Sequence, residues 1–303
     1  MLSVVVPCYN EEETVNIFYE KITKVLPTFC EKYELIFIDD GSKDSTIDKI
    51  KHLRENDNRI KFISFSRNFG KESAILAGFE KAKGDYIALL DVDLQDPIEL
   101  LPEMYKAVKF ENYDMAGARR TSRDGEPPIR SWCAGLFYLF MQKGLKIDLK
   151  NGARDYHLMK RDVLNSILSL REKTRFSKAL FPWIGYKTKV FEFKNIERVA
   201  GDTKWSFTQL LLYALDGIFA FSDIPLLFMS FCGVVFFLIA LIIACCLLIT
   251  QDISWKILTS ALVIMFLGVQ MLCFSVLAQY IAKIYNETKN RPHYLVREQS
   301  EDC

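Results

Sequence analysis

Short apolar runs alternate with longer, helix-like stretches along the amino-terminal part of the chain. The apolar runs are rich in Val, Ile, Leu and Phe, a composition that favours buried strands. Strands are predicted at Ser3–Val6, Glu34–Asp39, Lys61–Phe65 and Tyr86–Leu90, and helices at Glu11–Phe29, Ser45–Glu55 and Lys71–Lys81. This alternation predicts an α/β fold with an open, mainly parallel, Rossmann-like sheet that binds ligands at the carboxyl ends of its strands.

The carboxy-terminal part of the chain contains two long segments without a charged residue. They run from Ile224 to Gln251 and from Ile257 to Ala282, and each is longer than the roughly 20 residues that span a bilayer core. Two buried helices of a large soluble core are the alternative, but helices this long and apolar rarely pack into a chain of this size. We therefore expect two transmembrane helices, at 224–251 and 257–282, joined by a short link into a hairpin.

The charges beside the two segments indicate how the hairpin is oriented. The link carries Lys256 offset by Asp252, whereas the tail carries the basic residues Lys283, Lys289, Arg291 and Arg297. The positive-inside rule then puts both termini and the amino-terminal domain in the cytoplasm, with the protein in the cell membrane. No signal peptide is expected, because Leu2–Pro7 begins a strand directly.

A third apolar stretch precedes the first predicted span. It is interrupted by Ser206, Thr208, Gln209, Asp216 and Gly217 and is therefore too polar to cross a bilayer comfortably. We expect a helix that lies in the membrane interface, with a helix packed under the soluble domain as the alternative. The predicted order is an α/β domain at 1–204, a juxtamembrane helix at 205–223, spans at 224–251 and 257–282, and a cytoplasmic tail at 283–303.

The overall charge and the cysteine content exclude other classes of protein. The chain of 303 residues has a net charge of +1, whereas proteins that bind nucleic acid usually have a basic excess. Its 8 cysteines form no Cys-x-x-Cys pair, and several lie in apolar stretches, where cysteine behaves as a small hydrophobe. We therefore expect no nucleic-acid partner, no zinc site and no framework of disulfides.

Acidic residues follow the predicted strand Tyr86–Leu90. Asp91 and Asp93 are two residues apart at its end, so their side chains are expected on the same face. Carboxylate oxygens suit Mg²⁺ or Mn²⁺, which typically complete their coordination with substrate phosphates and water. The sequence therefore predicts a metal site for a phosphate-containing substrate.

Two other polar residues are predicted to cap helices. Asn10 is followed by three glutamates, and Asp96 is followed by Pro97 and then Glu99. Both patterns are typical of helix amino termini, where a short polar side chain binds free backbone N–H groups. For Asp96, a helix cap is preferred over the alternative role of a metal ligand.

Phosphate-binding loops of the Walker and Gly-x-Gly-x-x-Gly types are absent from the sequence, which weighs against ATPases and dinucleotide-binding enzymes. Four segments instead resemble family 2 glycosyltransferases of the GT-A fold: Val-Val-Val-Pro-Cys-Tyr-Asn-Glu-Glu (4–12), Ile-Asp-Asp-Gly-Ser-Lys-Asp-Ser-Thr (38–46), Ser-Arg-Asn-Phe-Gly-Lys-Glu (66–72) and Asp-Val-Asp-Leu-Gln-Asp-Pro (91–97). The most similar subgroup is the polyprenyl-phosphate glycosyltransferases, which include bactoprenol glucosyltransferases and dolichol-phosphate mannose synthases. The two spans and the tail from Tyr280 to Tyr294 resemble the bactoprenol branch in particular.

The resemblance implies roles for the residues at matching positions. The family's nucleotide-sugar-binding positions, where a carboxylate contacts the uracil ring, correspond to Pro7, Tyr9, Glu11, Asp39, Asp40 and Asp91. The family's Asp-x-Asp metal motif corresponds to Asp91 and Asp93, with Gln95 close by. A divalent metal ion, Mg²⁺ or Mn²⁺, is therefore the expected cofactor.

The resemblance also implies catalytic residues. A late Arg-x-x-Gly-x-Ser/Thr-Lys-aromatic motif, expected to close over the donor phosphates, is matched by Arg198, Gly201, Lys204 and Trp205. Asp155 matches the proposed base, although Arg154 and His157 replace the family's usual Gly and Arg beside it. A lipid monophosphate with a second pKa of ~6 is already largely dianionic at neutral pH. Asp155 is thus expected to act as a base, to orient the acceptor or to stabilise the oxocarbenium-like sugar, with a structural salt bridge as the alternative.

Arginines gather in a loop-like segment after the predicted metal motif. They are Arg119, Arg120, Arg123 and Arg130, close to Gly125, Pro127 and Pro128. Such a run is usually a solvated face, but the fork of an arginine side chain also suits phosphate oxygens. We expect Arg130 in the first place, and Arg119, to bind the acceptor phosphate.

Together these observations predict an inverting, metal-dependent glycosyltransferase. It is expected to transfer one sugar from UDP-glucose to undecaprenyl phosphate at the cytoplasmic leaflet, and to assemble as a homo-oligomer through its membrane region. UDP-N-acetylglucosamine and GDP-mannose are alternative donors. A processive polysaccharide synthase is disfavoured because the sequence has no Gln-x-x-Arg-Trp motif. The alternative outside the enzymes is a catalytically silent membrane scaffold or lipid-sugar carrier.

Overall fold

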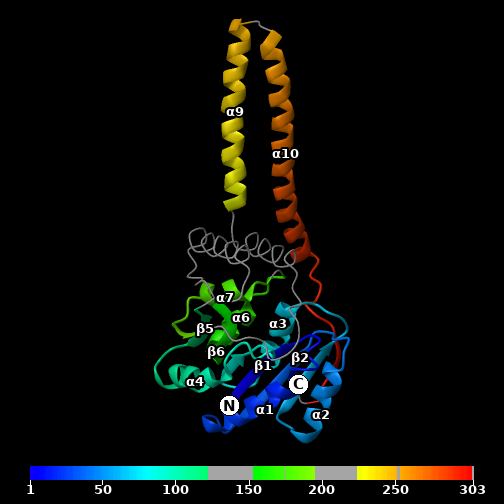
Figure 1. The fold of residues 1–303 in the computed structure, drawn as a ribbon, viewed down its shortest axis with the longest axis vertical. Coiled ribbons are helices and arrows are strands. Elements are labelled where there is room, and N and C mark those ends of the chain that lie inside the picture. The colour runs from blue at the N-terminus through cyan, green and yellow to red at the C-terminus, as the bar shows by residue number, and fades with distance from the viewer. Residues whose placement is uncertain (122–152, 174, 195–223, 251–252, 302–303) are drawn as a thin grey trace. The chain divides into compact units, whose positions relative to one another are not determined.

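The chain forms two compact units (Figure 1). A computed structural model describes residues 1–121, 153–173, 175–194, 224–250 and 253–301. The first unit combines Met1–Leu212 with Arg291–Cys303, and the second consists of Tyr213–Asn290. The carboxy-terminal residues therefore belong to the amino-terminal unit, although the second unit separates them from it along the chain.

Over the described residues, the first unit is built on one mixed sheet with the strand order β7-β5-β6-β4-β1-β2-β3-β8. The strands are β1 (Leu2–Cys8), β2 (Tyr33–Asp39), β3 (Ile60–Phe65), β4 (Tyr86–Leu89), β5 (Met115–Arg120), β6 (Ala153–Lys160), β7 (Thr188–Phe193) and β8 (Val296–Gln299). The pairs β1–β2, β1–β4, β2–β3 and β5–β7 are parallel, whereas β4–β6, β5–β6 and β3–β8 are antiparallel. The predicted α/β fold with a mainly parallel sheet is confirmed.

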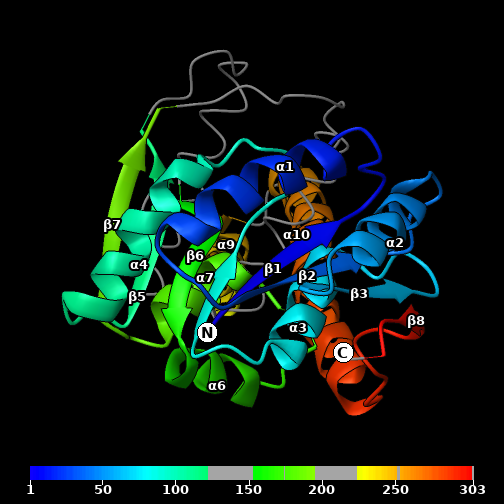
Figure 2. The ribbon, with the colours of Figure 1, turned by 90° about the horizontal axis from the view of Figure 1, so that it is seen from below.

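Helices cover both faces of this sheet (Figure 2). They are α1 (Val15–Val25), η1 (Leu26–Thr28), α2 (Thr46–Asn56), α3 (Lys71–Lys81), η2 (Ile98–Leu100), α4 (Leu101–Phe110), α6 (Arg161–Ser169) and α7 (Ser177–Trp183). Alternate strand residues point to opposite faces. Val4 and Val6 therefore pack with α1, α2 and α4 in one apolar cluster, while Val5 packs with α3 and α6 in the other. Because both faces are buried, the central strands read as continuous apolar runs.

The first predicted helix begins later than expected, and the prediction that Asn10 caps it is wrong. Helix α1 begins at Val15, and Thr14 is its N-cap residue. Asn10 instead has a positive φ of 51°. Its Oδ1 accepts a hydrogen bond from the backbone N–H of Lys43 at 2.8 Å. The polar groups near Asn10 thus tie the loop after β1 to the loop after β2.

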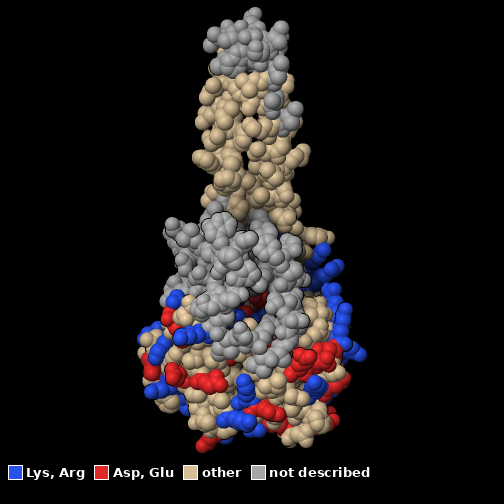
Figure 3. All heavy atoms as spheres, viewed as in Figure 1, with Lys and Arg blue, Asp and Glu red and all other residues tan. Residues whose placement is uncertain are grey.

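The second unit contains two long helices, α9 (Ile224–Thr250) and α10 (Ile253–Thr288). Their segments Pro225–Ile243 and Leu258–Thr288 have mean hydropathies of 3.0 and 2.4. Figure 3 shows uncharged side chains over most of the described part of these helices. Large apolar side chains on them are exposed, for example Phe231 at 66%. Both helices are thus long and apolar enough to cross a membrane, as predicted, and α10 continues beyond the predicted end at 282. The predicted juxtamembrane helix at 205–223 lies outside the described residues.

Candidate active site

The predicted nucleotide-binding and metal-binding residues lie at or just after the ends of strands β1, β2 and β4. These three strands are neighbours and run parallel, so their carboxyl ends meet at the same edge of the sheet. Tyr9 follows β1, Asp39 ends β2, and Asp91 follows β4. The topology therefore brings together motifs that are far apart in the sequence.

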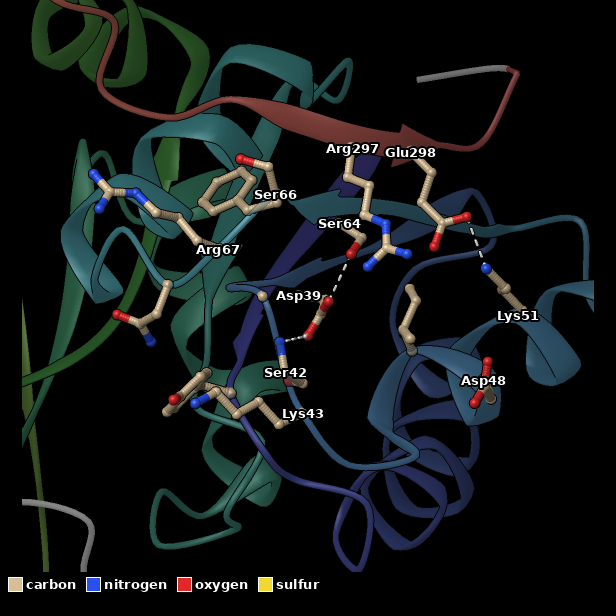
Figure 4. A pocket seen from close by; sticks show the side chains of 15 residues that line it. Asp39, Ser42, Lys43, Asp48, Lys51, Ser64, Ser66, Arg67, Arg297 and Glu298 are labelled. Carbon is tan, nitrogen blue, oxygen red and sulfur yellow. Dashed lines mark hydrogen bonds and ion pairs between the residues drawn. The ribbon is translucent and has the colours of Figure 1, made fainter.

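A cavity of about 620 Å³ opens beside the end of β2 (Figure 4). It is lined by Tyr9, Asp39, Gly41, Ser42, Lys43, Ile47, Asp48, Lys51, Ser64, Phe65, Ser66, Arg67, Asn68, Arg297 and Glu298. Two of the predicted nucleotide-binding residues, Tyr9 and Asp39, are in this lining. Pro7, Glu11, Asp40 and Asp91 are outside it, and their predicted contact with the nucleotide stays a prediction. The volume suits a small-molecule ligand.

Asp39 is fixed at the base of the cavity, where it is only 2% exposed. Its Oδ1 accepts a hydrogen bond from the backbone N–H of Ser42 at 3.0 Å, and its Oδ2 accepts one from the Ser64 hydroxyl at 2.7 Å. Each carboxylate oxygen has further acceptor capacity. Asp39 is therefore a rigid acceptor for a ligand N–H or O–H group.

Gly41 forms the turn after β2, between Asp39 and the cavity residues Ser42 and Lys43. Its φ is +67°, and a Cβ atom added to it would lie 2.3 Å from the carbonyl carbon of Arg67. Only a residue without a side chain fits both the positive φ and the close backbone approach. The loops after β2 and β3 thus touch each other through this glycine.

Replacing Gly41 with alanine should lower the free energy of unfolding by roughly 3 kcal/mol, because strain and overpacking add. It should also weaken binding of the expected uridine nucleotide at least about tenfold, since the displaced loop carries cavity residues. Thermal unfolding and titration calorimetry would measure the two effects. Gly185→Ala is the matched control, because Gly185 has a φ of +73° with nothing within 4 Å. If both variants behaved alike, the close approach at Gly41 would not matter.

Asp40 organises the loop that precedes α3. Its carboxylate accepts hydrogen bonds from the backbone N–H groups of Phe69 at 2.7 Å and Gly70 at 2.9 Å. Burial raises the pKa of Asp40 to about 6, because it outweighs the two amide hydrogen bonds and is reinforced by the charge of Asp39. The carboxylate holds the Ser-Arg-Asn-Phe-Gly-Lys segment against the end of β2.

Lys71 is a site residue that the sequence analysis did not assign. It is the first residue of α3, and its ammonium group lies 2.7 Å from Asp91 Oδ1 and 2.8 Å from Asp155 Oδ2. Burial by itself lowers the pKa of Lys71, but the charges of Asp155 and Asp91 raise it well above its usual value. Lys71 therefore pairs with both the predicted metal ligand, Asp91, and the predicted base, Asp155. The only signal for this role in the sequence was the position of Lys71 within segment 66–72, which resembles the family.

Asp155 lies on β6 and is held ionised. Burial alone would raise its pKa, but the charges of Lys71 and Lys178 and the hydrogen bond from Lys71 bring the pKa below its usual range. A carboxylate with a low pKa is a weak proton acceptor at neutral pH. These contacts therefore favour an orienting role over general-base catalysis.

The prediction that Asp96 caps a helix is wrong. The following helix, η2, has Pro97 as its N-cap residue and no side-chain cap, whereas Asp96 Oδ1 accepts a hydrogen bond from Arg154 Nε at 2.8 Å. Arg154 is the residue that replaces the family's usual glycine. Burial raises the pKa of Asp96 to about 6 against the lowering effect of Arg154, and the charges of Asp91 and Asp93 add to the rise.

The carboxylates around Asp93 fit a divalent cation in chemistry, although no cluster of three His, Cys, Asp or Glu side chains in metal-binding geometry exists among the described residues. Asp93 is 6% exposed, and its Oδ1 accepts a hydrogen bond from the Gln95 N–H at 3.1 Å. Between them, Leu94 has a φ of 58°, a strained conformation of the kind that clusters at functional sites. Asp96 Oδ2 and Asp155 Oδ1 are buried without a hydrogen-bond partner in the described part of the chain. Oxygen atoms of this kind suit Mg²⁺ or Mn²⁺.

The predicted phosphate-binding residues are described only in part. Arg119 lies on β5, and its guanidinium group forms an ion pair with Glu192 of β7 at 2.5 Å. Arg130, Arg198 and Lys204 lie outside the described residues.

Comparison with known proteins identifies the family of this chain. Residues 3–168 match the model of glycosyl transferase family 2. The chain is 40% identical to a putative glycosyltransferase, CsbB, of Bacillus subtilis, over 98% of this chain and 92% of the relative. It is 38% identical to a prophage bactoprenol glucosyl transferase homolog of Escherichia coli, over 98% of each.

Among solved structures, the mannosyltransferase PcManGT of Pyrobaculum calidifontis aligns with a TM-score of 0.47 and 14% identity, over 95% of this chain and 86% of that one. The family is assigned from the family model and from the two relatives. The model matches more than half of the chain, and both relatives align over nearly its whole length. The chain belongs to glycosyl transferase family 2 and is a glycosyltransferase.

Proposed function

We propose that this protein transfers one sugar from UDP-glucose to undecaprenyl phosphate, with inversion at the sugar C1. The observation that carries the proposal is a cavity and a carboxylate cluster at the same sheet edge, in a chain with two helices apolar enough to cross a membrane. The relative in Escherichia coli, named as a bactoprenol glucosyl transferase homolog, supports this choice of acceptor and sugar.

In this proposal the donor nucleotide occupies the cavity beside β2. Asp39 accepts a hydrogen bond from the uracil ring N–H, and Tyr9 contributes to the same lining. Pro7, Glu11 and Asp40 position the surrounding loops. The donor diphosphate then extends past the end of β1 toward Asp91 and Asp93, which follow β4.

Asp91 and Asp93, with Gln95 nearby, would hold the divalent cation, Mg²⁺ or Mn²⁺. A cation bound there supplies Lewis-acid stabilisation of the leaving diphosphate, typically worth several kcal/mol. Arg198 and Lys204 add positive charge at the same group in the proposal. Lys71 holds Asp91 and Asp155 at a fixed distance from each other.

The acceptor phosphate oxygen attacks the sugar C1 directly. The C1–O bond to the acceptor forms as the C1–O bond to UDP breaks, and UDP leaves with the bonding electrons. No proton has to be removed, because the acceptor is already largely dianionic at neutral pH. The lowered pKa of Asp155 supports its assignment as a residue that orients the acceptor, together with Arg130 and Arg119.

The proposal places the reaction at the cytoplasmic face of the cell membrane. The basic tail after α10 supports this orientation by the positive-inside rule. The polyprenyl chain of the acceptor would remain in the bilayer beside α9 and α10. Assembly of several copies through these helices is part of the proposal.

The test incubates membranes that contain the chain with radiolabelled UDP-glucose, UDP-N-acetylglucosamine or GDP-mannose and extracts the lipids. We expect labelled polyprenyl lipid from UDP-glucose only, and none from membranes that lack the chain. Label from another donor would replace UDP-glucose in the proposal. If no donor labelled the lipid and calorimetry detected no UDP binding, the silent scaffold would be favoured.

A further inference from the structure

The residues that follow α10 complete the sheet at its β3 edge. Strand β8 pairs antiparallel with β3, with Ser64 opposite Glu298. The pairing is extended on both sides, because the N–H of Ser66 donates to the Leu295 carbonyl at 2.9 Å and the N–H of Ser300 donates to the Phe62 carbonyl at 3.0 Å. The carboxy-terminal tail is therefore an integral strand of the catalytic unit.

An aromatic anchor fixes this strand. Tyr294 stacks on Phe65, with ring centroids 4.8 Å apart and an interplanar angle of 15°, and its hydroxyl donates a hydrogen bond to Glu80. Beyond the strand, Ser300 is only 5% exposed. These contacts on both sides of β8 define its register against β3.

The register contains an irregularity that directs one side chain. Val296 and Glu298 pair with the consecutive residues Phe65 and Ser64, so Arg297 is the extra residue of a β-bulge. Bulges often redirect a side chain next to an active site. Figure 4 shows Arg297 extending from β8 into the cavity, toward Asp39 and Ser64.

Arg297 is available to a ligand in this cavity. No hydrogen bond or ion pair joins its guanidinium group to any residue that the structure describes, whereas its neighbour Glu298 is paired with Lys51 at 2.8 Å. A guanidinium group has five N–H donors and no acceptor. Beside it, the Asp39 carboxylate can only accept hydrogen bonds, and its two oxygens have acceptor capacity beyond the bonds from Ser42 and Ser64. The cavity therefore presents a fixed acceptor and a free donor to the same ligand.

We propose that Arg297 is a donor-binding residue that donates a hydrogen bond to a carbonyl oxygen of the uracil base. A uracil ring offers an N–H group flanked by two carbonyl groups, which complements an Asp39 acceptor and an Arg297 donor. This inference rests on the proposed function, because it assumes a uridine nucleotide as the donor. It adds the carboxy-terminal strand, which follows the second apolar helix, to the nucleotide site.

The test compares the full-length, detergent-solubilised wild type with Arg297→Ala, Arg297→Lys and Arg291→Ala. Uridine, UMP and UDP serve as competitive inhibitors of sugar transfer, and UDP binding is measured by calorimetry. A hydrogen bond from a charged group predicts a loss of about 10- to 100-fold in affinity for Arg297→Ala. The loss should be the same for all three inhibitors, because the base is common to them.

The KM for the donor should rise by the same factor, with kcat changed less than about twofold. Arg297→Lys should recover part of the affinity. Arg291→Ala, which removes an exposed cation of the same tail outside the cavity, should behave as wild type. Thermal unfolding of all variants should be unchanged, because exposed residues contribute little to stability.

A loss confined to UMP and UDP would mean that Arg297 contacts phosphate, and would overturn the proposal. Unchanged inhibition by all three compounds would overturn it as well. Both outcomes are distinct from failure of the proposed function, in which the wild type itself would bind no UDP.

Discussion

Asp93→Ala should reduce sugar transfer by at least about a thousandfold while the protein stays folded and bound to the membrane. Asp93 is one of the two carboxylates assigned to the cation, and it is nearly buried, at 6% exposure. Loss of a Lewis acid removes several kcal/mol of transition-state stabilisation, and each 1.36 kcal/mol is about tenfold in rate. The initial rate of labelled lipid formation in membranes would measure the effect.

Two controls separate loss of the cation site from loss of the fold. Asp162→Ala removes an exposed carboxylate in the first turn of α6 and should transfer sugar at the wild-type rate. Uridine, which has no phosphate, should bind both variants as it binds the wild type, because the cavity beside β2 is intact. Unchanged turnover by Asp93→Ala would exclude Asp93 from the reaction.

In the absence of a divalent metal ion, Lys71→Met should lower the free energy of unfolding by roughly 3 kcal/mol, because Asp91 and Asp155 lose the ammonium group that they share. Breaking a buried ion pair typically costs about 3–5 kcal/mol, and the low end applies because a third of the Lys71 side chain is exposed. Excess Mn²⁺ should recover part of this loss, since Mn²⁺ bound at Asp91 would compensate the charge that Lys71 no longer neutralises. Thermal unfolding of the solubilised chain with and without Mn²⁺ would measure both effects.

The matched control for Lys71→Met is Lys160→Met. Lys160 is as exposed as Lys71, but it pairs with a single carboxylate, Asp114, which is 33% exposed. Its loss should cost at most about 1 kcal/mol, and Mn²⁺ should not reverse it. The double variant Lys71→Met/Asp155→Asn should be more stable than Lys71→Met alone, because one unpaired charge has been removed. Equal stability of the wild type and Lys71→Met, with equal responses to Mn²⁺, would show that the contacts of Lys71 with Asp91 and Asp155 do not stabilise the protein.

The central strands could be predicted from the sequence because both faces of the sheet are buried. Every position of β1 and of β2 is buried and most are apolar, so a short apolar run was sufficient to locate each strand. The apolar run of β4 also placed Asp91 and Asp93 at the end of a strand. The observed order of the strands brings these residues and the motifs after β1 and β2 to one edge of the sheet.

The two wrong cap predictions have a common cause. The local pattern at Asn10 and at Asp96 is typical of helix amino termini, but each side chain bonds to a partner that is distant in sequence. Asn10 accepts from the backbone of Lys43, and Asp96 is paired with Arg154. A tertiary partner of this kind outweighs a local capping preference.

Lys71 and β8 were missed for a different reason. The partners of Lys71 are 20 and 84 residues away, so no local charge pattern marks it. Strand β8 has only four residues, Val-Arg-Glu-Gln, and lies at the sheet edge, where polar residues are common. Its pairing depends on the bulge and on Tyr294, neither of which the pattern of apolar residues shows.

Identification of the leaving group would test the proposed reaction most directly. The purified full-length chain would be incubated with UDP-glucose, undecaprenyl phosphate and Mn²⁺, and the nucleotide product quantified together with the glycosylated lipid. Attack of the acceptor phosphate at C1 predicts one UDP for each lipid-linked glucose. No lipid product should form when a chelator replaces Mn²⁺, because the diphosphate then leaves unaided. Release of UMP would show transfer of a sugar phosphate, and release of UDP with free glucose would show hydrolysis; either result would contradict glycosyl transfer to the lipid.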